Sequence, residues 1–101
     1  MDIEQERAGK SVALALNGRL DTVNAPRLES KIKELEDITE LTLDFKEVSY
    51  ISSMGLRVLL QAKKTMKSNG VKLTIINMRD SVREIFEITG FLNLMAQEEK
   101  A

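Results

Sequence analysis

Residues 41–76 read LTLDFKEVSYISSMGLRVLLQAKKTMKSNGVKLTII, a strand–helix–strand pattern that predicts the fold class of the chain. Apolar strand patterns open and close it, at 41–45 and 71–76. Between them a helix is predicted over 54–68, with Asn69-Gly70 as its C-terminal stop. The predicted inward side of this helix comprises Leu56, Leu59, Leu60, Lys63 and Met66, with Lys63 extending its ammonium group toward water. Strand and helix alternate, which predicts an α/β fold with right-handed crossovers.

The segment before residue 41 continues this alternation. Residues 11–16 (SVALAL) alternate large and small apolar side chains, as a strand with one buried face does. Residues 1–7 offer only Ile3 as an inward side chain and are predicted to form a short edge strand. Asn17-Gly18 is typical of a hairpin turn, but the sequence after it favours an extended stretch leading into a helix.

Two further helices are predicted on either side of the central unit. The first begins near residues 24–26, with Asn24 as cap and Pro26 in the first turn, and closes at 37–39. The last begins at a cap formed by Asp80 or Ser81 and ends at Gly90. Its inward side chains are predicted to be Val82, Ile85 and Phe86. Residues 91–95 close the ordered region, and residues 96–101 are predicted to be a frayed tail.

Length and composition limit the chain to one domain with an aliphatic core. It has 101 residues, of which 43% are hydrophobic, 31% charged and only 4% aromatic. The net charge is −1 and no basic cluster occurs, which argues against nucleic acid as a partner and against an electrostatic membrane anchor.

The sequence lacks the residue types that several kinds of chemistry require. The chain contains no Cys and no His, so disulfides, thiol catalysis, imidazole acid–base chemistry and the usual zinc ligands are excluded. No carboxylate cluster supports a metal, and no cofactor is predicted. The start is polar, and no apolar run reaches the length of a membrane span, so we expect a cytoplasmic protein without direct membrane insertion.

Sites in such sheets gather at the carboxyl ends of strands, which here singles out the loops at 18–24 and 49–55. Ser52 and Ser53 lie just before a long helix, where free N–H groups and the helix dipole tolerate negative charge. Gly55 is expected to keep the first turn open to an approaching protein. A serine here is most often only a helix cap, and Asp21 equally suits a turn that bonds its own backbone. The residues alone predict a soluble α/β binding module.

Four segments carry a resemblance to a known family. The run VSYISSMGLRVLL (48–60) resembles the signature loop and helix of the STAS family, named for sulfate transporters and anti-sigma factor antagonists. GRLDTVNAPRLE (18–29), LTLDFKEV (41–48) and VREIFEITGFLNLM (82–95) resemble three further family motifs in the same order. The resemblance extends over residues 12–95.

The resemblance implies a single STAS domain over residues 1–101. Its fold would be a mixed sheet of four to five strands, with three to four helices packed mainly on one face. Aligning Gly55-Leu56 with the family Gly-Leu places Ser53 on the phosphorylated serine and Ser52 where an aspartate is frequent. Asp21 matches the family aspartate beside that loop. The predicted partner-binding residues are Asp21, Thr22, Ser52, Ser53, Met54, Gly55 and Arg57, with Val58 as a further candidate. Relatives commonly have another helix after the strand-like segment that 92–95 matches.

The implied function is that of an anti-sigma factor antagonist, not of an enzyme. The unphosphorylated form would bind an anti-sigma factor that is also a serine kinase and so release its sigma factor. Phosphorylation of Ser53 would end binding, and a PP2C-type phosphatase would restore it. The expected state is a monomer or a weak dimer.

Two alternatives remain open. A STAS subunit of a membrane lipid-transport ABC complex would dock on its ATPase without phosphorylation. A small flavodoxin-like phosphotransfer enzyme would need an acidic cluster and a lysine, which Asp21 and Asp44 do not assemble, and no glycine-rich phosphate loop is present.

Overall fold

The sheet has four strands in the order β1-β2-β3-β4 and both kinds of strand pairing. The computed structural model describes residues 1–93, so the predicted tail at 96–101 lies outside the described residues. The strands are β1 (Asp2–Ala8), β2 (Ser11–Leu20), β3 (Glu40–Ile51) and β4 (Lys72–Ile76). β1 pairs with β2 antiparallel, while β2–β3 and β3–β4 are parallel, so the predicted mixed sheet and the edge strand are confirmed.

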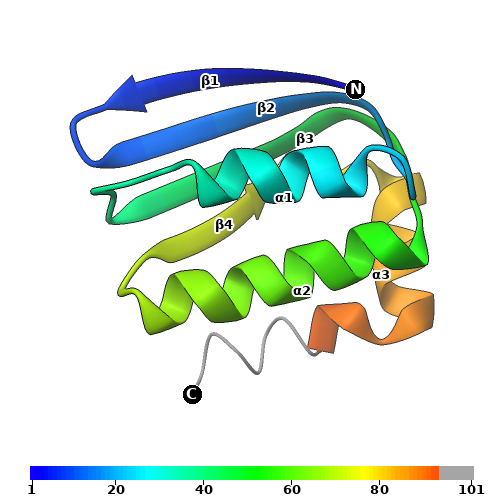
Figure 1. Ribbon diagram of the computed structural model, residues 1–101. Helices are drawn as coiled ribbons and strands as arrows, with labels where there is room; N and C mark the ends of the chain where they lie inside the picture. The colour runs from blue at the N-terminus through cyan, green and yellow to red at the C-terminus, as the bar shows by residue number, and fades with distance from the viewer. Residues whose placement is uncertain (94–101) are drawn as a thin grey trace.

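The helices cover one face of this sheet, as predicted (Figure 1). They are α1 (Ala25–Lys33), α2 (Ser53–Ser68) and α3 (Asp80–Thr89). Residues 91–93 are also helical, so the strand-like assignment of 92 and 93 is wrong, and 94 and 95 lie outside the described residues. The opposite face of the sheet has no helix over it in the described part of the chain.

The core lies between the sheet and the helices. Alternate residues of the central strands are buried: Val12, Leu14 and Leu16 of β2 and Leu41, Leu43 and Phe45 of β3. Amphipathic helices cover them, with Leu28, Leu59 and Phe86 among the fully buried side chains. Lys63 is also buried, and its Nζ donates to the Leu73 carbonyl at 3.0 Å, so the predicted extension of its ammonium toward water is wrong.

Both central strands run further than predicted. β3 continues through 46–51, where the polar composition indicated a connection, and β2 continues through Asn17-Gly18. The pairing shifts register between Ala15 and Asn17 and again between Gly18 and Arg19. These irregularities break the strict alternation of buried and exposed residues, which explains why a two-residue period does not reveal the later part of either strand.

Two helix ends also differ from prediction. α1 ends at Lys33, because the chain then turns to bury Leu35 and Ile38 partly against the core, and Asp37 has a positive φ of 54°. α3 begins at Asp80 with Arg79 as its N-cap, earlier than either predicted cap allows. Its predicted stop at Gly90 is confirmed, since Gly90 takes the left-handed conformation at φ 78°.

Candidate functional site

The two loops singled out at the strand ends lie next to each other. Leu20 and Ile51, the last residues of β2 and β3, are register partners in the parallel pair. The Ser52 amide donates to the Leu20 carbonyl at 3.0 Å, which extends the pairing by one residue. The two loops singled out from the sequence, 18–24 and 49–55, therefore lie side by side at one edge of the sheet.

Ser52 is the N-cap of α2. Its backbone is extended (φ −93°, ψ 172°), and its Oγ accepts from the Gly55 amide at 3.2 Å. The same hydroxyl donates to the Leu20 carbonyl at 3.4 Å, and the side chain is half-buried. Such a cap satisfies one of the N–H groups that a helix start leaves without an intrahelical partner. Ser52 therefore has a structural task.

Ser53 is the first residue of α2, and it is exposed. Within residues 1–93 its hydroxyl makes no hydrogen bond to the chain. The first turn of this 16-residue helix contains no acidic residue, so the partial positive charge of the N-terminus is not neutralised there. An anionic group added to Ser53 Oγ would meet favourable electrostatics and open solvent.

Gly55 is buried, which corrects the reason predicted for it. A Cβ at this position would lie 2.6 Å from the Leu20 carbonyl oxygen and 2.8 Å from Ile51 Cγ1. The glycine therefore lets the start of α2 pack closely on the ends of β2 and β3. It does not open the loop to a partner.

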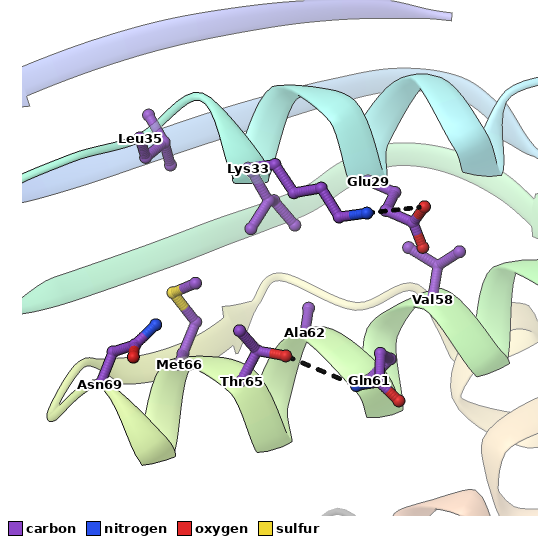
Figure 2. A pocket seen from close by; sticks show the side chains of 10 residues that line it. Glu29, Lys33, Leu35, Val58, Gln61, Ala62, Thr65, Met66 and Asn69 are labelled. Carbon is purple, nitrogen blue, oxygen red and sulfur yellow. Dashed lines mark hydrogen bonds and ion pairs between the residues drawn. The ribbon is translucent and has the colours of Figure 1, made fainter.

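The remaining predicted contact residues lie on the first two turns of α2 and differ in solvent exposure. Met54 is 40% exposed, and Arg57 is exposed as well, as a contact surface requires. Val58 is buried, so its proposed place among the contact residues is wrong. Figure 2 shows the reason, since Val58 points from α2 toward α1.

A groove of about 320 Å³ lies between α1 and α2, and Val58 is one of the residues that line it. The Glu29–Lys33 ion pair, at 3.5 Å, lies at its α1 side (Figure 2). Ala62 and Met66 line the groove on the α2 side and are themselves almost fully buried. No residue of the two loops at the strand ends lines it, so the groove is separate from the surface around Ser53.

Asp21 fulfils the turn role that its residue type allows. Its Oδ1 accepts from the amides of Val23 and Asn24 at 3.1 and 3.0 Å. Its side chain is 30% exposed to solvent, and its Oδ2 lies 3.9 Å from Arg19 Nε. Asn24 stands at the N-cap of α1 without a side-chain cap bond, because its Nδ2 donates to the Arg19 carbonyl at 2.9 Å instead. Thr22 is exposed between them.

Three residues of this edge were not predicted. The Arg19 guanidinium carbon lies 4.3 Å from the centroid of the Tyr50 ring, a cation–π geometry. Val23 is 76% and Tyr50 37% exposed, so together with Met54 they place large apolar side chains on both loops. Arg19 and Tyr50 are register partners only because β2 and β3 run beyond their predicted ends.

The described residues offer little for other kinds of site. No group of three or more His, Cys, Asp or Glu side chains in residues 1–93 is placed to hold a metal ion. None of the helices found there is both long and apolar enough to cross a membrane. The chemistry that the edge does offer is a free hydroxyl at a helix start, surrounded by exposed side chains.

Comparison with known proteins identifies the family. Residues 2–101 match the STAS domain family over nearly the whole chain. The chain belongs to the STAS domain family. The putative anti-sigma factor antagonist BtrV of Bordetella bronchiseptica is 32% identical over 96 residues, which cover 93% of this chain and 83% of BtrV. The anti-sigma-B factor antagonist of Staphylococcus aureus strain NCTC 8325 is 28% identical over 97 residues, 94% of this chain and 90% of that protein.

Solved structures share the STAS fold of this chain. An anti-sigma factor antagonist from Mycobacterium paratuberculosis has a TM-score of 0.78 at 21% identity, covering 88% of this chain and 77% of its own. Unphosphorylated SpoIIAA has a TM-score of 0.71 at 19% identity, covering 85% of this chain and 82% of its own. Phosphorylated SpoIIAA has a TM-score of 0.70 at 20% identity, covering 92% of this chain and 87% of its own. The structure of Mglu contains the same fold in 20% of its chain (TM-score 0.71, 21% identity, 78% of this chain). At these identities the likeness shows the fold alone.

Proposed function

We propose that this STAS domain is an anti-sigma factor antagonist switched by phosphorylation of Ser53. The unphosphorylated form binds an anti-sigma factor that is also a serine kinase, and the sigma factor is released. The observation that carries the proposal is the division of labour between adjacent serines. Ser52 is occupied as the helix cap, while the Ser53 hydroxyl is exposed and unbonded within residues 1–93.

The relatives support this function over a transport role. BtrV and the Staphylococcus aureus protein are both named as anti-sigma factor antagonists, and each is matched over more than nine tenths of this chain. SpoIIAA, an anti-sigma factor antagonist of the same fold, has been solved in unphosphorylated and phosphorylated forms. A subunit of a lipid-transport ABC complex would require no phosphorylatable serine at this position.

The switch follows from the charge that phosphate adds. Ser53 Oγ attacks the γ-phosphorus of ATP held by the kinase, the bond to the β–γ bridging oxygen breaks, and the hydroxyl proton passes to a base of the kinase. The product carries about −1.5 to −2 charges at neutral pH. Covering that charge with a partner surface built to contact Met54 and Tyr50 imposes a desolvation cost. A loss of about 3 kcal/mol weakens binding roughly 150-fold.

Exposed residues on both loops would form the contact surface. Met54 and Val23 supply apolar area, and Arg57 lies one helical turn after Ser53 on α2. Asp21 positions its own loop through the bonds of Oδ1 and also presents part of its carboxylate to solvent. Gly55 contributes indirectly, by letting α2 pack on β2.

In this proposal the chain is a substrate and a ligand, and it catalyses nothing. A PP2C-type phosphatase would hydrolyse the phosphoserine and return the protein to its binding form. The exchange of partners would take place in the cytoplasm, where sigma factors meet RNA polymerase. The protein would act there as a monomer or a weak dimer.

The decisive experiment uses an anti-sigma factor serine kinase from the same organism, together with ATP. Intact-mass spectrometry should show one phosphate on the wild type and on Ser52→Ala, and none on Ser53→Ala. Binding to the kinase should persist in Ser53→Ala and be lost in Ser53→Asp. Ser68→Ala, at the exposed far end of α2, is the matched control and should resemble the wild type in both assays.

Two results would contradict the proposal. Full phosphate incorporation into Ser53→Ala, with none into Ser52→Ala, would move the switch to the neighbouring residue. Stable co-purification with a transporter ATPase, unaffected by either serine variant, would favour the ABC-complex alternative.

A further inference from the structure

The face of the sheet opposite the helices is a second surface with a defined shape. In Figure 1 all labelled helices lie on the other side of the sheet. The strand registers place two cross-strand rows on this open sheet face, Glu4–Ala15–Asp44–Ile76 and Glu6–Ala13–Thr42–Thr74. Every member of these rows is exposed or half-buried, whereas Leu14 and Leu43 between the rows point into the core.

A shallow trough runs along β2 on the open sheet face. It encloses about 170 Å³ and is lined by Glu4, Glu6, Ala13, Ala15, Thr42, Asp44 and Ile76. Ala13 and Ala15 form its floor because their side chains are the smallest in the rows. Its two walls stand on β1 and β3, which are two interstrand spacings apart, or about 9.6 Å. This is the distance between strand backbones, so an α-helix, about 10–12 Å wide with side chains, would rest over the trough and span its two walls without entering it.

The trough is negatively charged on both sides. Glu4 and Glu6 stand on the β1 wall and form no ion pair with any residue in 1–93. Asp44 stands on the β3 wall, where Oδ1 accepts from the Lys46 amide at 2.9 Å and from Asn77 Nδ2 at 3.2 Å. No basic residue lines the trough. The three carboxylates therefore have no basic side chain among the residues that line the trough, and Lys72 stands in the next row of this face, as the register partner of Glu40.

One end of the trough offers an apolar contact. Ile76, at the end of β4, is 40% exposed on this face and shares a row with Asp44. An exposed isoleucine beside small side chains gives a partner apolar area to cover, in addition to the charges.

We propose that the open sheet face is a docking surface for a basic amphipathic α-helix of a partner protein. The helix lies along β2 with a stripe of small side chains over Ala13 and Ala15. Its Lys or Arg side chains reach Glu4 and Glu6 on one wall and Asp44 on the other, and an apolar side chain covers Ile76. No residue of the Ser53 loop lines the trough, so this binding goes beyond the proposed function and is independent of phosphorylation.

The test titrates the full isotope-labelled chain with a synthetic helical peptide of alanine and lysine, whose lysines flank an alanine stripe. At low salt the amide shifts in NMR spectra should concentrate on Ala13, Ala15 and Thr42. Changing Glu4→Gln, Glu6→Gln and Asp44→Asn together should weaken binding about tenfold, since each exposed ion pair contributes modestly. The double variant Glu4→Gln/Glu6→Gln leaves the Asp44 hydrogen bonds intact and should still weaken binding about threefold.

Controls separate docking from general charge attraction. Glu84→Gln/Glu87→Gln removes two exposed carboxylates from α3 and should change affinity less than about twofold. Ala15→Gln fills the trough floor without changing charge and should weaken binding as much as the double variant does. Shifts centred on the helices, equal effects of both double variants, or no effect of Ala15→Gln would each overturn the proposal. Self-association that the trough variants abolish would also overturn it, because the occupant would then be a second copy.

Discussion

Replacing Ser52 by alanine separates the two serines by their tasks. The substitution removes the acceptor of the Gly55 amide, a bond of 3.2 Å at the first turn of α2. Loss of a serine N-cap costs about 1 kcal/mol. The second bond of the hydroxyl, at 3.4 Å to the Leu20 carbonyl, is longer than an ordinary O–H···O bond and adds little. That carbonyl also keeps its bond from the Ser52 amide at 3.0 Å.

The expected loss is therefore about 1 kcal/mol, which lowers Tm by roughly 4–8 °C in a domain of this size. Thermal melts and urea unfolding followed by circular dichroism measure it directly. Ser52→Asp is the matched control, because aspartate caps helices as well as serine does, and its Tm should stay near that of the wild type. Ser53→Ala alters an exposed, unbonded hydroxyl and should change stability by less than about 0.5 kcal/mol.

The opposite pattern would refute this assignment. If Ser53→Ala lost the stability and Ser52→Ala lost none, Ser53 would be the cap. The free hydroxyl, and with it the candidate phosphate acceptor, would then be Ser52.

Three further outcomes follow from the same site. Gly55→Ala should destabilise by about 1–3 kcal/mol in urea unfolding, because its Cβ would lie 2.6 Å from a carbonyl oxygen; a gain in stability, as helix propensity alone favours, would contradict the packing. Phosphorylation of Ser53 should raise stability by about 0.3–1 kcal/mol through the helix dipole, an increment that high salt removes; a salt-independent change in Tm would exclude that cause. Met54→Ala should weaken partner binding about fivefold in calorimetry with Tm unchanged, and unaltered affinity would remove Met54 from the interface.

The sequence was most informative where its patterns were regular. Alternating residues 11–16 and 41–45 predicted both central strands and their buried faces correctly, because the period of two persists there. The prediction failed at 46–51, where the register shifts interrupt the alternation and polar residues occupy a strand. The predicted end of α1 lies too far along the chain for a related reason, since Leu35 continues the helical spacing but packs on the core from the segment after the helix.

At the candidate site, residue type predicted the location better than the role of each side chain. Serines before an apolar helical run indicate its start, but only the three-dimensional structure distinguishes the cap, Ser52, from its exposed neighbour. The sequence predicts that Gly55 opens the surface, but in the structure Gly55 packs closely against Leu20. This contact depends on a strand that is distant in the sequence. The cation–π pair of Arg19 and Tyr50 arises from register between strands, which no local pattern encodes.

The carbonyl group of Leu20 accepts from both the amide and the hydroxyl of Ser52 and lies against Gly55. Two hydrogen bonds and the close packing at Gly55 thus anchor the loop that presents Ser53 to the sheet. A partner arriving at this edge meets a shape that was fixed during folding. The conformational entropy that flexible recognition segments lose on association has little counterpart here, so more of the contact free energy is retained as affinity.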